Sequence, residues 1–440
     1  MTYREHLQAT LKLSIPLIIG QLSQTIISLS DTTMVGNYNT DSLAAAALAN
    51  GLFFMIFILG LGITLGITPL NTDSFVNNQI ERSKKLLKNG VWLYGACGVL
   101  ITIVLLSLSF FLDRMGQAPK IVLLARPYMH IISISCIPIF LFFAFRNFVQ
   151  SFQDTRIPTV IELSTALLNV LLNYLLIFGE GGFPELGLIG AGWATLLARL
   201  VGLVAMVVYF MAKYKIYLEG VAWFSLDRVV IIELLKIGVP IGLALFFETS
   251  AFGFANIMTG WIDPETQAAH LIALNIASTT FLVALGVSLA GSVRVAHYLG
   301  LQQKSNVRLA GQAAITLAVS IMAIFALLIV MLRHHLPVYW VDDPQSVVIG
   351  ITAELLVVAA IFQLSDGLQV AANNALRGMA DVQVPSLITL FAYWAVGIPC
   401  GYLLGFTFGL GALGIWVSLA IALTASAALL TWRFYKLSKA

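Results

Sequence analysis

Residues 11–31 read LKLSIPLIIGQLSQTIISLSD, an apolar run of Leu, Ile, Pro and Gly that ends on a carboxylate, Asp31. Gln21, Gln24 and Ser28 precede it at helical spacing, so a helix here carries a polar stripe along one side. An ionisable side chain is costly within a bilayer, faces the protein interior or a water-filled cavity, and marks an ion or substrate pathway. The stretch therefore indicates a membrane protein with a polar pathway.

The composition supports an integral membrane protein. Only 10% of the residues are charged and 59% are hydrophobic, the mean hydropathy is +0.92, and soluble domains carry about 25% charged residues. Apolar runs long enough to cross a ~30 Å hydrocarbon layer recur near 13–33, 45–70, 90–112, 127–149, 158–179, 187–212, 233–258, 268–293, 309–332, 346–372, 384–406 and 411–432. We therefore expect an all-α fold of twelve transmembrane helices.

Lys and Arg residues set the expected orientation. With twelve spans both termini share a side, and 19 Lys and Arg residues fall on that side against four on the other, with Arg199 inside a span. The positive-inside rule then places both termini in the cytoplasm of a multi-pass inner (plasma) membrane protein. The net charge of +3 reflects this topology, and we expect no nucleic-acid partner.

The chain repeats itself. The run LKLSIPLIIG around Pro16 recurs 224 residues later as LKIGVPIGLA around Pro240, and QDTRIP around Asp154 recurs as ADVQVP around Asp381. Each half then holds six spans in the same orientation, as in parallel-repeat transporters. We predict two homologous six-helix bundles, 1–218 and 219–440, around a central cleft that opens to either side in turn.

Three polar residues of the first half are expected at one depth. Counted from the basic end of each helix, Asp31, Asn173 and Thr195 lie roughly 26–28 Å into the protein. Asn169 adds an amide one turn from Asn173. A carboxylate with amide and hydroxyl oxygens suits a proton or a hard cation. The open alternative is a protonated carboxylate that only joins helices.

The second half carries two acids. Glu248 and Asp366 are both about 17 Å from a basic helix end. Two acids at one depth repel each other unless a proton or cation lies between them, so we predict a Na⁺ or H⁺ site here. Arg199, the lone cation within a span, is expected to pair with a carboxylate or carbonyl. The residues that we expect to line a cavity are Gln21, Gln24, Ser28, Phe247, Asn275, Gln363 and Asn373.

The sequence lacks the common motifs for nucleotide binding and catalysis. The P-loop pattern GxxxxGKS/T is absent, so ATP is not the evident energy source. HExxH, GxSxG and Cys/His clusters are absent as well. We therefore expect no enzyme activity and no cofactor beyond a coupling ion.

Several segments together resemble the multidrug and toxic compound extrusion (MATE) transporters, most closely the NorM-like bacterial branch. They are SDTTMVG with Asp31, LLNVLLNYLLIFG with Asn169 and Asn173, PELGLIGAGWAT with Thr195, LFFETS with Glu248, SVRVAHYLG, and QLSDGLQVAANNALRG with Asp366. The resemblance covers nearly the whole chain in order.

The resemblance implies a secondary antiporter that expels cationic amphiphilic drugs in exchange for inward Na⁺ or H⁺. It associates Glu248 and Asp366 with sodium coupling, and Asp31, Asn173 and Thr195 with proton or sodium binding. We expect a monomer whose partners are small organic cations, the coupling ion and the bilayer. The alternatives are a lipid-linked oligosaccharide flippase, whose cavity would need several cations, a channel, and a membrane enzyme.

Overall fold

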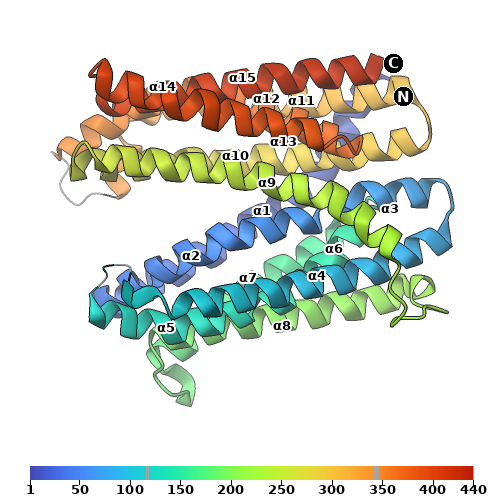
Figure 1. Ribbon diagram of the computed structural model, residues 1–440, viewed down its shortest axis with the longest axis horizontal. Coiled ribbons are helices and arrows are strands. Elements are labelled where there is room, and N and C mark those ends of the chain that lie inside the picture. The colour runs from blue at the N-terminus through green and yellow to red at the C-terminus, as the bar shows by residue number, and fades with distance from the viewer. Residues whose placement is uncertain (115, 117, 341–345, 440) are drawn as a thin grey trace. The chain divides into compact units, whose positions relative to one another are not determined.

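The protein folds entirely into helices in the computed structural model, which describes residues 1–114, 116, 118–340 and 346–439. Across these residues, twelve helical stretches are long and apolar enough to cross a membrane. The expected twelve-helix, all-α fold is thus confirmed (Figure 1). The helices extend past the apolar runs, since the first begins at Tyr3 rather than near residue 13.

The first half of the chain contains eight α-helices. They are α1 (Tyr3–Tyr38), α2 (Thr40–Thr64), α3 (Ile67–Val76), α4 (Ile80–Ser109), α5 (Pro119–Ile134), α6 (Cys136–Gln150), α7 (Arg156–Phe178) and α8 (Leu188–Lys213). Two spans expected to be continuous, 45–70 and 127–149, are therefore each interrupted. The carbonyls freed at these breaks are satisfied by neighbouring helices, which makes a break tolerable within a membrane. Asn147 Nδ2 donates to the Thr64 carbonyl at 3.0 Å, and the Thr102 hydroxyl donates to the Ser133 carbonyl at 2.7 Å.

The second half contains α9 (Arg228–Gly260), α10 (Pro264–Gly300), α11 (Lys304–Leu332), α12 (Val347–Gly378), α13 (Gln383–Leu390), α14 (Ile398–Tyr402) and α15 (Gly411–Lys439). The π-helical segments Phe391–Gly397 and Leu403–Thr407 flank α14. Pro399 lies within α14 and has no N–H to donate, and a widened helical turn is one way to accommodate such a residue.

The residues group by contact into two units. One consists of residues 19–242, and the other of residues 1–18 together with 243–440. Both boundaries fall inside a helix, two residues after Pro16 in α1 and two residues after Pro240 in α9. The same 224-residue step that relates the two prolines therefore also relates the two boundaries.

Close backbone packing explains why each of these helices begins in one unit and ends in the other. A Cβ on Gly62 of α2 would lie 2.2 Å from Gly242 Cα, so α2 holds the start of α9 within the unit 19–242. A Cβ on Gly286 of α10 would lie 2.5 Å from Ile18 Cγ1, so α10 holds the start of α1 in the other unit. Gly62 and Gly286 are themselves 224 residues apart. Each repeat thus has a glycine at the equivalent position. Gly62 of the first repeat allows close approach of α9, and Gly286 of the second repeat allows close approach of α1.

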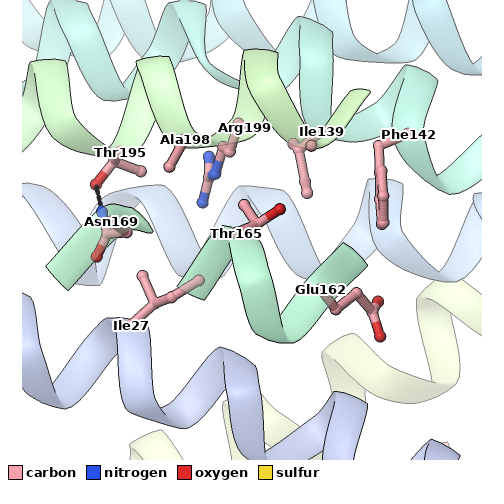
Figure 2. Close-up of a pocket in the computed structure, with 10 residues that line it drawn as sticks. Ile27, Ile139, Phe142, Glu162, Thr165, Asn169, Thr195, Ala198 and Arg199 are labelled. Carbon is pink, nitrogen blue, oxygen red and sulfur yellow. Dashed lines mark hydrogen bonds between the residues drawn. The ribbon is translucent and has the colours of Figure 1, made fainter. Parts of the chain in front are cut away.

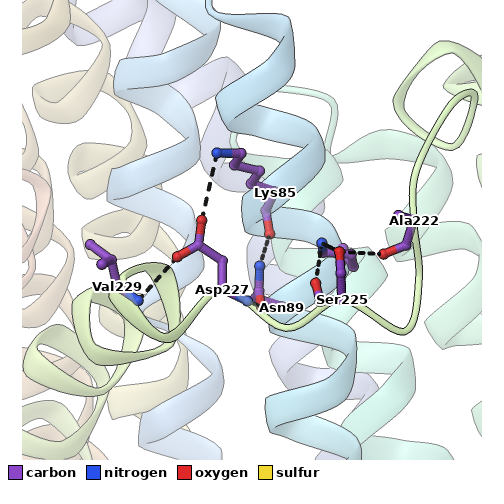
Figure 3. A network of polar contacts seen from close by, with 7 residues as sticks. Lys85, Asn89, Ala222, Ser225, Asp227 and Val229 are labelled. Carbon is purple, nitrogen blue, oxygen red and sulfur yellow. Dashed lines mark hydrogen bonds and ion pairs between the residues drawn. The ribbon is translucent and has the colours of Figure 1, made fainter.

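The linker between the repeats, residues 214–227 between α8 and α9, is fastened to the N-terminal part of α4 (Figure 3). Asn89 Oδ1 accepts a hydrogen bond of 2.9 Å from the backbone N–H of Asp227, and Lys85 Nζ lies 3.6 Å from an Asp227 carboxylate oxygen. Lys88 donates to the carbonyl of Ser225. Asp227 in turn accepts from the Val229 N–H at 3.1 Å, which begins α9. The linker is therefore part of the unit 19–242.

Candidate functional site

Asp31 lies in a polar cluster formed by α1, α7 and α8. Its Oδ1 accepts a hydrogen bond from Asn173 Nδ2 at 2.5 Å, and its Oδ2 accepts one from the Thr195 hydroxyl at 3.3 Å. Asn169 Nδ2 donates to Thr195 Oγ1, and Asn169 Oδ1 accepts from Asn173, both at 3.3 Å. The structure thus brings together all four residues that counting along the helices put near one depth.

The sequence folds this way because α7 carries its polar residues on one face. Glu162, Thr165, Asn169 and Asn173 follow one another at steps of three or four residues, which superposes them along a helix. Asn169 and Asn173 are fully buried. Buried amides need hydrogen-bond partners, and the carboxylate of Asp31 with the hydroxyl of Thr195 supplies them.

A cavity runs along this polar face (Figure 2). It opens onto about 440 Å³ of space not filled by protein atoms, part of it open solvent. Its lining residues are Ile27, Ile139, Phe142, Glu162, Thr165, Asn169, Thr195, Ala198, Arg199 and Gly202. One end of the cavity therefore meets the Asp31 cluster through Asn169 and Thr195, and Glu162 lies toward the other end.

Arg199 supplies a fixed positive charge to this cavity. Its Nη1 donates to the Ser135 hydroxyl at 2.6 Å, and its guanidinium lies over the Phe53 ring, 5.4 Å from the centroid. The hydrogen-bond partner is therefore a hydroxyl rather than the expected carboxylate or carbonyl. Arg199 still interacts electrostatically with Asp31, so the acid of this cluster has a cation of the protein itself within range.

A buried ion pair at Glu162 was missed by the sequence analysis. Arg146 Nε lies 2.6 Å from Glu162 Oε1, and the two side chains are 9% and 2% exposed. Arg146 had been counted among the basic residues of the cytoplasmic side. Its position four residues before the end of α6, an apolar helix, gave no separate signal in the sequence.

Glu248 is the centre of a second cluster, formed by α9, α12 and the π-helical segment Phe391–Gly397. Its Oε1 accepts a hydrogen bond from Gln369 Nε2 at 3.0 Å. The Tyr393 hydroxyl lies 3.2 Å from the same Glu248 oxygen and 3.0 Å from Gln369 Oε1. A phenol has one proton, so Tyr393 donates to the carboxylate or to the amide but not fully to both.

Asp366 belongs to the same cluster. It is 8% exposed and interacts electrostatically with Glu248 and with Tyr393. The two acids therefore lie within electrostatic range of each other, and their role as an ion site stays a prediction. Gln369, one turn after Asp366 on α12, was not predicted, and Tyr393 was not assigned a hydrogen-bonding role.

The residues predicted to line a cavity differ in how deeply they are buried. Gln363 is buried and donates to the Thr280 hydroxyl at 2.5 Å. Asn373 is partly buried, whereas its neighbour Asn374 is buried and donates to the Ser288 hydroxyl at 3.0 Å. The Phe247 carbonyl accepts from Trp394 Nε1 at 3.1 Å.

The remaining predicted residues lie outside these clusters. Asn275 is exposed, and its carbonyl accepts from the Thr279 hydroxyl. Gln21 and Ser28 do not line the cavity of Figure 2, and the side chain of Gln24 lies outside the described part of the structure. From residues 21–31 of α1, Asp31 therefore belongs to the cluster with Asn173 and Thr195. Ile27 lines the cavity.

Over residues 1–114, 116, 118–340 and 346–439, no three His, Cys, Asp or Glu side chains gather in a way that could hold a metal ion. A cation at either cluster would therefore be held by one or two carboxylates together with amide, hydroxyl or carbonyl oxygens, which are the ligands of hard cations.

Comparison with known proteins assigns the family. The MatE family model matches residues 16–175 and again residues 240–403. The chain belongs to the MatE family. The two matches begin 224 residues apart, the step already seen in the sequence, in the glycine contacts and in the boundaries of the two units. The expected family is thus confirmed.

Similar proteins cover nearly the whole MatE chain. It is 35% identical over 99% of its length to a "Probable multidrug resistance protein NorM" of Rhodopseudomonas palustris, of which 93% is covered. A protein of the same name from Rhizobium meliloti is 33% identical, with 98% of this chain and 94% of that protein covered. These relatives are named as resistance proteins rather than as enzymes, as we expected for a non-enzyme.

Solved structures share the fold. An outward-facing multidrug resistance MATE family transporter of the MOP superfamily superposes with a TM-score of 0.90 at 21% identity, over 99% of this chain and 96% of that chain. The eukaryotic MATE transporter AtDTX14 gives a TM-score of 0.87 at 17% identity, over 99% and 98% of the two chains. The MatE fold is therefore preserved where most of the sequence has changed.

Proposed function

We propose that this MatE protein is a secondary active antiporter that exports cationic amphiphilic compounds in exchange for inward Na⁺ or H⁺. The observation that carries the proposal is the pair Glu248 and Asp366, two acids buried in one cluster with Gln369 and Tyr393. The names of the relatives, multidrug resistance proteins, support an organic substrate.

The physical argument concerns charge. Two carboxylates held close together away from water repel each other when both are ionised, and a proton or a monovalent cation between them removes that repulsion. Gln369 and Tyr393 bond to Glu248 without bringing charge, and the one cation that acts on Glu248 in the described structure, Arg377, balances only one of the two acids. The cluster therefore binds a small cation from the side of higher concentration and releases it to the other.

Binding of the ion must change the affinity for the drug. An ion shifts a conformational equilibrium only through its different affinities for the two states. One monovalent cation that moves down 100 mV provides ~2.3 kcal/mol, which supports roughly a fifty-fold gradient of a neutral solute. For a monovalent cationic drug, exchange against one Na⁺ moves no net charge, so the chemical gradient of Na⁺ drives it.

The proposal includes the placement of the protein. The excess of Lys and Arg on one side supports an inner (plasma) membrane location with both termini in the cytoplasm. A monomer suffices, because each cluster is built within a single chain. A lipid-linked oligosaccharide flippase is less well supported, because Arg199 is the one basic residue among those that line the cavity of Figure 2.

Ethidium efflux tests the proposal. Membrane vesicles that contain the protein are loaded with ethidium, and a Na⁺ gradient and a pH gradient are imposed separately. We expect efflux that depends on at least one of the two gradients and needs no ATP. The antiporter proposal would be contradicted if the rate of ethidium efflux were the same without either gradient. It would also be contradicted if no organic cation were exported under any gradient.

A further inference from the structure

An open cavity lies where the start of α11 meets the end of α15, within the unit of residues 1–18 and 243–440. It opens onto about 940 Å³ of space, part of it open solvent. The residues that line it are Lys304, Ser305, Arg308, Leu309, Gln312, Ser438 and Lys439. It is far along both helices from the Glu248 cluster, and the proposed ion exchange makes no use of it.

The two helices that form this cavity carry positive charge without negative charge. Neither α11 nor α15 contains an Asp or Glu residue. Arg433 of α15 is neutralised by Asp381, with its Nε and Nη2 at 2.5 and 2.9 Å from the two carboxylate oxygens. Arg308 and Lys439 have no carboxylate partner in the described structure. The cavity therefore favours an anion.

Arg308 is held in position for such an anion. Its guanidinium lies over the Tyr435 ring, 5.7 Å from the centroid. Its Nε is buried and has no hydrogen-bond partner, so this atom does not face the cavity, which Arg308 lines with the rest of its side chain. A planar guanidinium that is already oriented pairs well with the oxygens of a phosphate group.

Helix α11 adds neutral donors. No side chain caps its N-terminus, so the N–H groups of Ser305 and Asn306 lie beside the Ser305 hydroxyl as donors for a ligand, and the helix dipole favours negative charge there. A helix end alone would not make a site. Together with Arg308 and Lys439 it provides the mixture of charge and directed donors that a phosphate diester requires.

The surroundings indicate a lipid as the source of that phosphate. Trp432, on α15, is 61% exposed, and Lys436 Nζ lies 5.0 Å from the centroid of its ring. An exposed Trp next to basic residues is typical of the membrane–water interface. Both chain termini lie at this end of the unit (Figure 1), the end that the Lys and Arg distribution places in the cytoplasm. Basic pockets between transmembrane helices on the cytoplasmic side suit anionic lipid headgroups.

We propose that this cavity binds the phosphodiester headgroup of an anionic phospholipid of the cytoplasmic leaflet. Arg308 and Lys439 pair with the phosphate oxygens, and the first turn of α11 with Ser305 donates to the remaining oxygens. The acyl chains lie along the apolar outer surface near Trp432. The site is separate from the ion-coupling clusters, so it stands whether or not the antiporter proposal does.

Lipid titration of the full-length protein tests this site. The purified chain in detergent is titrated with a fluorescent phosphatidylglycerol, and binding is read by energy transfer from its tryptophans. We expect Arg308→Gln/Lys439→Gln to bind about 30-fold more weakly, and the exposed single variant Lys439→Gln about fivefold more weakly, as the attraction of each basic side chain to an anionic surface predicts. Phosphatidylcholine should bind neither protein measurably.

A matched control separates the site from general charge. Lys84→Gln/Lys215→Gln removes the same charge from the unit of residues 19–242, and we expect phosphatidylglycerol to bind it as it binds the unmodified chain. Since Lys439 is exposed, its variant folds whatever Arg308 contributes to packing. Unchanged affinity in Lys439→Gln, or an equal loss in the control, would overturn the proposal. Displacement of the lipid by inorganic phosphate alone at millimolar concentration would overturn the lipid assignment.

Discussion

The two repeats place their buried acids at different positions. Across the 224-residue step Asp31 of α1 corresponds to Ala255 of α9, and Glu248 of α9 corresponds to Gln24 of α1. The first cluster holds one carboxylate with two amides, a hydroxyl and the nearby charge of Arg199. The second holds two carboxylates with an amide and a phenol. The duplicated fold therefore carries two clusters of different charge.

The difference in charge separates the expected roles. Asp31 and Glu248 each have a cation of the protein within electrostatic range, Arg199 and Arg377 respectively. Only the second cluster has a further carboxylate, Asp366, so an added ion there also relieves a repulsion between two acids. We infer that sodium dependence comes mainly from the second cluster and that the first cluster modulates transport. Variants of Glu248, Asp366, Asp31 and Tyr393 test this division of roles between the two clusters.

The largest effect is expected at the second cluster. Glu248→Gln and Asp366→Asn should each abolish sodium-stimulated ethidium efflux from vesicles, because one acid without its partner no longer requires a cation. Glu354→Gln, an exposed acid on the same helix as Asp366, should leave the stimulation intact. Size-exclusion profiles confirm that the variants insert and fold. Unaltered sodium stimulation in both acid variants would remove the basis of the comparison.

A smaller effect is expected at the first cluster. Asp31→Asn keeps the shape of the side chain but removes the charged acceptor of Asn173 and Thr195, and a hydrogen bond to a charged group contributes enough that efflux should fall about tenfold. Sodium stimulation of the remaining efflux should persist. Efflux rates are measured over a range of Na⁺ concentrations at constant pH. Loss of all sodium dependence in Asp31→Asn would mean that the two clusters are coupled rather than divided.

Tyr393 allows a finer test of the second cluster. Tyr393→Phe removes one hydroxyl that bonds to Glu248 or Gln369 and leaves both acids in place. Because a single neutral hydrogen bond contributes about 1 kcal/mol, the Na⁺ concentration for half-maximal efflux should change about fivefold while stimulation survives. Tyr402→Phe, at an exposed tyrosine, is the control. A complete loss of stimulation in Tyr393→Phe would make the phenol as necessary as the acids.

The sequence predicted the helices and the acids better than their partners. Apolar runs and charge asymmetry are properties of whole segments, so the twelve spans could be predicted from the chain. Counting from the basic ends brought Asp31, Asn173 and Thr195 to one depth, because helical rise is regular. Counting does not give the rotation of a helix about its axis. It therefore could not show that Asn374, rather than its neighbour Asn373, is the buried amide that bonds to Ser288.

Interactions within apolar segments were the least predictable. The Arg146–Glu162 pair joins buried side chains of two helices, and neither apolar runs nor counting along one helix relates residues on different helices. Gln369 could have been found, since it lies one turn after Asp366 on the same helix. Tyr393 could not, because its hydroxyl reaches Glu248 only through the π-helical segment Phe391–Gly397, and a widened helical turn has no clear signature in one sequence.

The smallest effect concerns the positions where the repeats agree, the loop acids Asp154 and Asp381. Asp154 accepts hydrogen bonds from Lys213 Nζ at 2.6 Å and from the Tyr214 hydroxyl at 2.7 Å. The Tyr209 hydroxyl donates to it as well. Arg433 binds both oxygens of Asp381. Asp154 thus connects the loop before α7 to the end of α8, and Asp381 connects the loop before α13 to α15. Because these groups are partly exposed, Asp154→Asn should lower the free energy of unfolding by only about 1 kcal/mol.

The dependence of that loss on pH identifies its cause. Burial raises the pKa of Asp154, but the hydrogen bonds from Lys213, Tyr209 and Tyr214 outweigh it and hold this pKa below its ordinary value of 3.8. A carboxyl with a lowered pKa stabilises the fold above the pKa of the unfolded chain, and the stabilisation is lost as the pH falls through the lowered pKa. Thermal unfolding in detergent should therefore separate Asp154→Asn from the unmodified chain at pH 7, and the two should converge as the pH falls below about 4. A separation that stays constant to pH 3 would mean that the amide disturbs the loop by its shape, and that the agreement between the repeats is one of packing rather than of charge.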